Sequence, residues 1–462
     1  MAPTRTGLST LQLWRLFLLT GALVVSAAAQ VNVRDSQTPQ QPESSHPAYS
    51  SELRQKAESG DSAAQLNLGL AYRDGNGVAT DLPAASSWLT KSAKQGNPLA
   101  EYEMGVSYQI GHGVSQDYGQ ARKWFLEAAN QGHAPAQNNI GYLYSHGFGV
   151  PKSRDEALRW YSMAAENGLI EAQVNAGLLY YARGGPADYA NALKWFRRAA
   201  DSGSPSAQNA LGTMYADGKG VPQNHSTALE WFRAAAKHGL AAAETNLAIM
   251  YVEGRGVSKD YTEAVNELIA AARQEYPLAQ DVLGTLFEQG KGVPVDLSRA
   301  WRLRQLAARA GVVSAQKHVA LMYEKGLGCK KDPGEAFSWM SKAADQGDVE
   351  AESLIGYYYL KGIGTESKYP EAARWFQKAA AHGDTLAQVE LGFMHENGFG
   401  VKLDYAEAYA WFTLAKQNGY KKSALYLSDL RKIMTRDQIK RAEELSVAKA
   451  QENESGCSNC GM

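Results

Sequence analysis

The residues best suited to chemistry in this chain are its three cysteines and nine histidines. Cys457 and Cys460 form a C-x-x-C pair in the tail ESGCSNCGM, whereas Cys329 stands alone. In an oxidising compartment the pair favours a small, strained disulfide or pairing with another chain. Metal binding would need two further ligands, and a redox enzyme would need a strand–helix–strand context that this tail lacks.

The other reactive groups form no catalytic or metal-binding motif. The histidines are scattered, with no H-E-x-x-H sequence and no carboxylate at the spacing of a metal site. No G-x-S-x-G motif occurs. Glycine pairs such as Gly111/Gly113 would suit a phosphate only between a strand and a helix, and here they join two predicted helices. The sequence therefore predicts no enzyme, no cofactor and no metal site.

The elements that carry these residues are copies of one repeat, each marked by a glycine. The glycine recurs every 36 residues, with one step of 35, and alanine replaces it at Ala248 and Ala320. A fixed period of this length is typical of a solenoid. The glycines are Gly69, Gly105, Gly141, Gly177, Gly212, Gly284, Gly356 and Gly392.

The repeat glycine lies in a predicted first helix. Alanine stands five residues before it in every repeat, from Ala64 to Ala387. Three residues after it comes an aromatic residue in nine repeats, as in Tyr108, and His395 in the tenth. These offsets lie on one face of a helix, where small residues let a neighbouring helix approach closely.

A second helix follows in each repeat. Tryptophan occupies one position in eight of the ten repeats, and alanine stands three residues earlier in all ten, from Ala85 to Ala408. Seven residues before the tryptophan position, Asp, Asn or Ser is the predicted N-cap, including Asp188 in the fourth repeat, with Lys368 as the exception. Glycines such as Gly96 end this helix.

These residues resemble the Sel1-like repeat family, which is related to the tetratricopeptide repeats. The family pattern A-x-x-x-L-G-x-x-Y-x-x-G-x-G-V is visible in Ala136–Val150, and D-x-x-x-A-x-x-W in Asp404–Trp411. The resemblance covers residues 61–419. It implies an all-α fold: a right-handed α/α superhelix of about ten helix–turn–helix repeats with a C-terminal pair of capping helices.

Composition excludes some classes of partner. The chain is 44% hydrophobic and carries a formal net charge of −1. No global positive field favours nucleic acid or an anionic membrane.

The N-terminus has the pattern of an export signal. Arg5 and Arg15 precede the apolar run Leu16–Val25, which is followed by an A-x-A-like site, so cleavage is expected after Ala29. The alternative is an uncleaved membrane anchor, although the run is short for a bilayer span. We expect an exported protein, secreted or periplasmic, with the periplasm of a Gram-negative bacterium as the favoured location.

The regions outside the repeats have distinct predicted roles. Residues 30–50 are rich in Gln, Ser and Pro and predict a disordered linker. Residues 51–60 predict an N-terminal capping helix. Residues 420–450 predict two capping helices at 422–432 and 435–450, the second capped by Thr435 or Asp437. Residues 451–462 are predicted to be a flexible tail.

The repeat pattern breaks at three points. The fourth repeat has Arg183-Gly184-Gly185-Pro186 at its turn, which predicts a tightened turn. The sixth and seventh repeats replace the tryptophan by Glu267 and Leu303, and Glu275 replaces the terminal glycine of the sixth. Two interpretations stay open, a local change of superhelical curvature and a hinge or docking surface.

Partner-binding positions follow from similarity to the tetratricopeptide fold. Residues one and four positions after the first-helix glycine are expected to line a concave surface, and large aromatics there suit a peptide segment. The alternative is that they seal contacts between successive first helices. The candidates are Tyr142, Tyr181, Tyr357 and Phe393, with Asn138 on the preceding turn.

The sequence therefore predicts an exported interaction scaffold that presents a concave groove to an envelope or secreted protein or peptide. It predicts no nucleic-acid partner and no stable membrane insertion after signal cleavage. One alternative is an envelope enzyme, because cysteine-rich Sel1-like proteins have been linked to β-lactam binding and hydrolysis. Those members carry paired cysteines in each repeat, which this chain lacks. The other alternative is a redox or metal role of the Cys457/Cys460 tail.

Overall fold

The computed structural model describes residues 46–459, with the backbone alone for residues 452–459, and every regular element in this part of the chain is an α-helix. The helices form two compact units, an N-terminal unit of residues 46–259 and a C-terminal unit of residues 260–459. The predicted signal peptide at residues 1–29 and most of the predicted linker lie outside the described residues, as does Cys460.

Ten helix pairs, α3/α4 to α21/α22, confirm the predicted α-solenoid. The first helices have odd numbers and the second helices even numbers. In the N-terminal unit the helices are α2 (Ser51–Glu58), α3 (Ser62–Asp74), α4 (Leu82–Ala93), α5 (Pro98–Ile110), α6 (Tyr118–Asn130), α7 (Ala134–His146), α8 (Arg154–Glu166), α9 (Ile170–Arg183), α10 (Pro186–Asp201), α11 (Pro205–Asp217), α12 (His225–Ala236) and α13 (Ala241–Glu253). In the C-terminal unit they are α14 (Tyr261–Arg273), α15 (Pro277–Gln289), α16 (Leu297–Arg309), α17 (Val313–Lys325), α18 (Pro333–Asp345), α19 (Val349–Lys361), α20 (Tyr369–Ala381), α21 (Thr385–Asn397), α22 (Tyr405–Gln417), α23 (Ser423–Ile433) and α24 (Arg436–Asn459).

Local sequence explains where the second helices begin. The carboxylate of Asp117, for example, accepts a hydrogen bond from the backbone N–H of Gln120, which the first turn of α6 would otherwise leave unpaired. The prediction for the fourth repeat was wrong. There α10 begins earlier, at Pro186, and Asp188 lies inside its first turn, where it forms an ion pair of 2.7 Å with Arg183. Proline at the first helical position and the glycines before it replace the usual cap.

The repeat glycine allows an aromatic ring to reach the first helix. A Cβ atom on Gly141 would lie 2.7 Å from Cδ1 of Tyr161, so any larger residue would push this ring away. Tyr161 follows the repeat tryptophan directly, and its position was not singled out from the sequence. In most other repeats the residue at this position is also aromatic and buried: Phe125, Phe196, Phe232, Phe376 and Phe412. The ring and the glycine together set the spacing between the two helices of a repeat.

The N-terminal end of the stack differs from the prediction. Helix α2 lies within the predicted capping segment, but the predicted linker is already docked from His46 onward. The backbone N–H of Tyr49 donates to the carbonyl of Asn76 at 2.8 Å, and the Tyr49 ring meets the Tyr72 ring edge-on at 5.9 Å. The side chain of Ser50 caps α2. Residues 46–50 therefore cover the first repeat.

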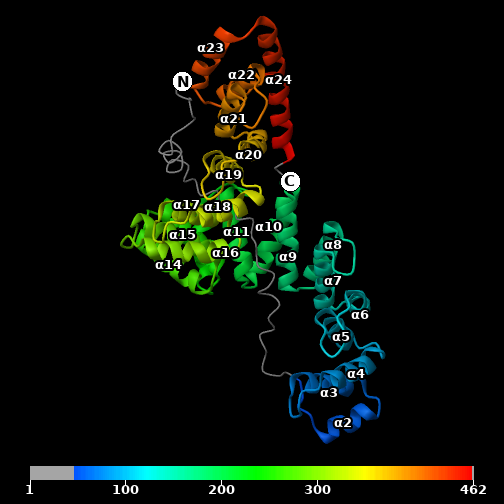
Figure 1. Cartoon of the computed structure of the whole chain (residues 1–462). Coiled ribbons are helices and arrows are strands. Elements are labelled where there is room, and N and C mark those ends of the chain that lie inside the picture. The colour runs from blue at the N-terminus through cyan, green and yellow to red at the C-terminus, as the bar shows by residue number, and fades with distance from the viewer. Residues whose placement is uncertain (1–45, 460–462) are drawn as a thin grey trace. The chain divides into compact units, whose positions relative to one another are not determined.

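The C-terminal end is closed by α23 and α24, as predicted. Thr435 and Gln438 form a reciprocal capping box, in which the Gln438 N–H donates to the threonine hydroxyl and the Thr435 N–H to the glutamine side chain. Helix α24 packs along α22 (Figure 1), and Nζ of Lys449 lies 4.1 Å from the Trp411 ring centroid. The prediction of a flexible tail from residue 451 was wrong as far as Asn459, because α24 continues to that residue.

Candidate partner-binding face

The candidate partner-binding surface lies on the first helices. We call it the first-helix face and define it, in each unit, as the residues two or three positions before and one or four positions after the repeat glycine. Most of these side chains are half-buried, as Asn138, Tyr142 and Tyr181 are. Each unit has its own first-helix face.

In the N-terminal unit a side-chain hydrogen bond joins four of the five neighbouring pairs of first helices. Two of these bridges are pairs of asparagine amides. The bridges are Arg73–Glu103 at 2.6 Å from α3 to α5, Asn175–Asn138 at 3.0 Å between α7 and α9, Tyr181–Asp217 at 3.1 Å from α9 to α11, and Asn246–Asn209 at 2.9 Å between α11 and α13. Asn138 and Tyr181, both predicted to bind a partner, thus also seal contacts between repeats.

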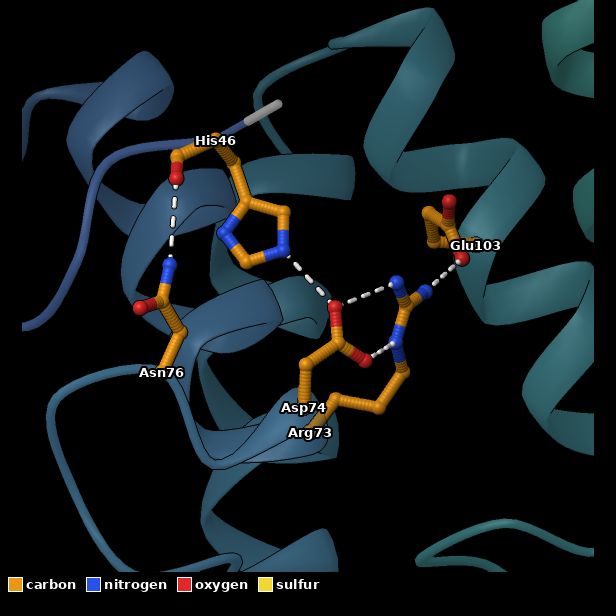
Figure 2. A network of polar contacts seen from close by, with 5 residues as sticks. All are labelled: His46, Arg73, Asp74, Asn76 and Glu103. Carbon is orange, nitrogen blue, oxygen red and sulfur yellow. Dashed lines mark hydrogen bonds and ion pairs between the residues drawn. The ribbon is translucent and has the colours of Figure 1, made fainter. Parts of the chain in front are cut away.

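The first bridge belongs to a larger polar network, shown in Figure 2. Arg73 donates two hydrogen bonds to Asp74 and one to Glu103, while Nε2 of His46 lies 2.7 Å from Asp74 (Figure 2). Asn76 holds the backbone carbonyl of His46 at 3.2 Å. Burial opposes ionisation of Asp74, but the hydrogen bonds from Arg73 and His46 outweigh it and lower its pKa. The network therefore fixes residues 46–50 at the edge of this face.

At Glu103 the effect of burial on the pKa outweighs that of the neighbouring positive charge. Burial raises the pKa of the Glu103 carboxyl even though the neighbouring Arg73 charge acts to lower it. The hydrogen bond from Arg73 holds this carboxyl in a fixed position between α3 and α5. The end of the face at the first repeat is therefore already occupied by its own side chains.

An aromatic group stands beside the amides of α7. Asn138, Tyr142 and His146 follow one another at steps of four residues, so they form one stripe down the helix. The His146 ring lies 4.2 Å from the Tyr142 ring centroid and is stacked on Phe148 at 5.4 Å, and Phe148 is stacked on Tyr118 at 4.9 Å. His146 is exposed and the other rings of this group are half-buried. A partner could reach these ring faces without unfolding a repeat.

The five predicted residues are divided between the two units. Asn138, Tyr142 and Tyr181 belong to the N-terminal unit, whereas Tyr357 and Phe393 belong to the C-terminal unit. Tyr357 is half-buried against the cores of two neighbouring repeats, and burial raises its pKa.

The prediction for Phe393 was wrong. Its side chain is only 7% exposed and packs against Phe412 at 5.1 Å and Tyr426 at 4.9 Å between ring centroids. Tyr426 belongs to the capping helix α23, whose contact with the last repeat covers the position. The repeat pattern alone carries no sign of this cover, because the cap lies beyond the repeats.

The first-helix face of the C-terminal unit contains a buried charge network that sequence analysis missed. Arg304 is 1% exposed and occupies the position of the aromatic ring opposite Gly284. Its guanidinium donates to Thr285 at 3.0 Å and pairs with Glu288 at 2.7 Å and Asp281 at 3.7 Å. The signal that could have found it is a charged residue in the position directly after Leu303, where the other repeats are apolar.

Asp281 is the centre of this network. Besides Arg304, it accepts a hydrogen bond from Ser314 at 2.6 Å and lies 3.5 Å from Nδ1 of His318. Burial acts to raise the pKa of Asp281, but His318, Arg304 and Ser314 outweigh it and lower the pKa. These contacts neutralise a buried carboxylate and hold α15 against α17.

The described residues offer little else for chemistry. Among the side chains that the structure describes, residues 46–451, no cluster of three or more His, Cys, Asp or Glu could hold a metal ion. Cys329 is a half-buried free thiol, and burial raises its pKa, which disfavours the reactive thiolate. The predicted Cys457–Cys460 disulfide lies outside the residues whose side chains are described. No helix in the described part of the chain is long and apolar enough to span a membrane.

A stack of paired helices with bridged first helices defines an α-solenoid repeat protein. The family model described as Sel1 repeat matches ten consecutive segments over residues 62–420, and the chain therefore belongs to the Sel1 repeat family. The matched segments are residues 62–97, 98–133, 134–169, 170–204, 205–240, 241–276, 277–312, 313–348, 349–384 and 385–420.

Solved structures of this family resemble the chain. The protective antigen c5321 of uropathogenic Escherichia coli, which displays an SLR fold, is 33% identical over 88% of this chain and 96% of its own, with a TM-score of 0.54. A Sel1 repeat protein from Oxalobacter formigenes is 34% identical over 53% of this chain and 99% of its own, with a TM-score of 0.49. Among curated proteins, none matches the chain.

Proposed function

We propose that the protein is an exported scaffold that binds a segment of another protein on the first-helix face of its N-terminal unit. A Sel1-repeat solenoid favours protein–protein interaction over catalysis. The observation that carries the choice of face is the group of rings around Tyr142, exposed at His146, directly beside the asparagine amides of α7 and α9. Rigid aromatic surfaces next to polar groups that fix orientation are typical of protein-binding sites.

The C-terminal unit is a poorer candidate for the same role. Four residues on its first-helix face, Asp281, Glu288, Lys317 and His318, are engaged in ion pairs, such as Lys317 with Asp348 and Glu350 at 3.0 and 2.7 Å. Separating such pairs to contact a partner would leave charges without their counterions. This face is better suited to holding the repeats together.

Export and a non-enzymatic role belong to the same proposal. Arg5, Arg15 and the apolar run Leu16–Val25 support export, with the periplasm as the proposed location. N-terminal sequencing of the purified chain should then begin at Gln30, and a chain that begins at Met1 would contradict cleavage.

Binding is tested with the tagged full chain expressed in its native host and purified after crosslinking. The Tyr142→Ser variant is compared with the matched Tyr357→Ser variant, after circular dichroism has shown that both are folded. The proposal expects wild type and Tyr357→Ser to capture the same protein and Tyr142→Ser to capture at least tenfold less. Capture retained by Tyr142→Ser, or no captured protein with wild type, would overturn it.

A further inference from the structure

We propose that the asparagine bridges of the N-terminal unit bind the main chain of an extended peptide segment of the partner. This inference rests on the proposed function and specifies what the face recognises. The feature behind it is confined to one unit. Asparagine occurs six times at the positions two and three before the repeat glycine in the N-terminal unit, whereas the C-terminal unit has none there. The six are Asn67, Asn138, Asn139, Asn175, Asn209 and Asn246.

The two amide pairs are built in the same way. In each pair, the asparagine on the later helix is the donor. Nδ2 of Asn175 donates to Oδ1 of Asn138 at 3.0 Å, and Nδ2 of Asn246 donates to Oδ1 of Asn209 at 2.9 Å. A side-chain amide has two N–H donors and one carbonyl acceptor, so one bond leaves each pair with unused groups.

The unused groups are a complete NH2 on the earlier asparagine and a carbonyl on the later one. Within residues 46–459, the NH2 groups of Asn138 and Asn209 and the carbonyls of Asn175 and Asn246 form no hydrogen bond. The side chains of Asn138, Asn175 and Asn246 are half-buried and that of Asn209 is 5% exposed, so the Asn138–Asn175 bridge is the more accessible of the two. Each bridge therefore has one unused donor and one unused acceptor, and each residue of a peptide main chain carries one N–H and one C=O that could pair with them.

The arrangement favours a main chain over a side chain. Both bridges have the same polarity, with the donor on the earlier helix and the acceptor on the later one, so a chain crossing both would meet them in one direction. The bridges are two first helices apart, on the order of 20 Å for packed helices. This distance is about six residues of extended chain. The bond within each pair holds the amides in place before binding and reduces the entropy lost on association.

Side-chain recognition would come from the neighbouring rings. Tyr142 follows Asn138 by one turn of α7. Tyr181, on α9, lies between the two bridges. Its hydroxyl donates a hydrogen bond of 3.1 Å to the Asp217 carboxylate, and Nζ of Lys219 lies 5.1 Å from its ring centroid. Burial raises the pKa of Tyr181 to about 12, so its phenol stays neutral. A segment held mainly by its main chain is expected to vary in sequence except where it meets these rings.

The test uses a random library of 12-residue peptides displayed on phage and selected against the full chain. A selected peptide is measured by fluorescence anisotropy against Asn138→Asp and Asn209→Asp. These substitutions keep the acceptor that the partner asparagine needs, so the bridge stays closed, but they replace the unused donor by an acceptor. Asn191→Asp, at an exposed position of α10, is the control for the added charge.

We expect each bridge variant to weaken binding by roughly tenfold and the control by less than twofold. N-methylation of the peptide at two peptide groups about six residues apart should weaken binding by a similar factor. Alanine substitution of the same two residues should change it by less than about threefold. Bridge variants that bind like wild type, or a peptide that tolerates every N-methyl group, would overturn the inference.

The two proposals can fail separately. If Tyr142→Ser abolishes peptide binding while the bridge variants and N-methylation have no effect, the face binds peptides but does not read the main chain. If no peptide is selected, or if no change on this face affects a selected peptide, the proposed function fails and this inference fails with it.

Discussion

The N-terminal and C-terminal units have the same repeat core but differ in the groups that join their first helices. In the N-terminal unit two of the four bridges are uncharged pairs of asparagine amides, and these pairs retain unused hydrogen-bonding groups. In the C-terminal unit charged groups join them, with Asp281, Lys317 and Arg304 all largely buried. The difference shows that one repeat pattern can support either a surface that is open to a partner or one that is closed on itself.

The largest effect is expected where the C-terminal unit departs most from the repeat core. Arg304→Ala should lower the free energy of unfolding by about 3–5 kcal/mol, because it leaves the Asp281 carboxylate buried without its guanidinium partner. Urea denaturation followed by tryptophan fluorescence measures this loss.

The matched control introduces the arrangement of the fourth repeat into the seventh. Asp281→Val combined with Arg304→Phe reproduces Val174 and Phe196, the pair that packs around Gly177. The double variant should lie within about 1.5 kcal/mol of wild type, because a buried ion pair can be replaced by packed apolar side chains. An Arg304→Ala variant as stable as wild type would show that the network does not stabilise this unit.

A second difference between the units appears at Glu390, which stands where the N-terminal unit has asparagines such as Asn139 and Asn175. Burial raises the pKa of Glu390 to about 7, although Lys361 acts to lower it. Between the ordinary glutamate pKa and this value, the folded state binds more protons than the unfolded state. Stability contributed by the protonated carboxyl is therefore present below the ordinary pKa and is lost as pH rises through the folded value.

Glu390→Gln should remove this loss. At pH 8 the variant is expected to be more stable than wild type by up to about 3 kcal/mol, and the difference should be much smaller at pH 5. Urea midpoints at the two pH values check this, with the exposed Glu366→Gln as the control. A difference that is the same at both pH values would contradict the assigned burial of the charge.

In the N-terminal unit a smaller effect is expected. Asn209→Ala and Asn246→Ala should each cost about 1 kcal/mol, and the double variant should cost less than the sum because both remove the same bond. The double-mutant cycle should give a coupling of about 1 kcal/mol. Strictly additive losses would mean that the 2.9 Å amide contact contributes nothing to stability.

The smallest effect concerns the start of the C-terminal unit. Glu275 has a φ of 60°, the one positive φ of a non-glycine residue within residues 46–459, at a position where other repeats have glycine. Glu275→Gly should raise stability by about 0.5–1 kcal/mol, because glycine adopts this conformation without a Cβ clash. Gly239→Glu in the N-terminal unit is the converse control and should lower stability. A loss with Glu275→Gly would show that its side chain stabilises the turn.

Much of the fold could be predicted from sequence because each repeat depends on its neighbours through the same few positions. The period, both helices and the alanine and tryptophan positions follow from spacing alone. The aromatic position after the tryptophan was missed because Leu89, Leu268, Arg304 and Met340 interrupt it. Asp188 was misplaced because Pro186, which can start a helix two residues earlier, was not weighed against it.

The ends and the candidate site were harder to predict because they depend on contacts between segments rather than on spacing. Nothing local marks His46 as a partner of Asp74, and the burial of Phe393 depends on Tyr426 in a helix beyond the repeats. Asn138 and Tyr181 were placed on a binding surface from the repeat pattern. That they also bridge neighbouring helices follows only from the geometry of those helices.

The most direct test of the difference between the units is site-specific photocrosslinking in the native host. A benzoylphenylalanine is introduced at Tyr142 in one variant of the full chain and at Tyr357 in the other, and crosslinked proteins are identified by mass spectrometry. The account predicts one specific partner crosslinked from position 142 and none from position 357. The same partner crosslinked only from position 357 would contradict the assignment of binding to the N-terminal unit.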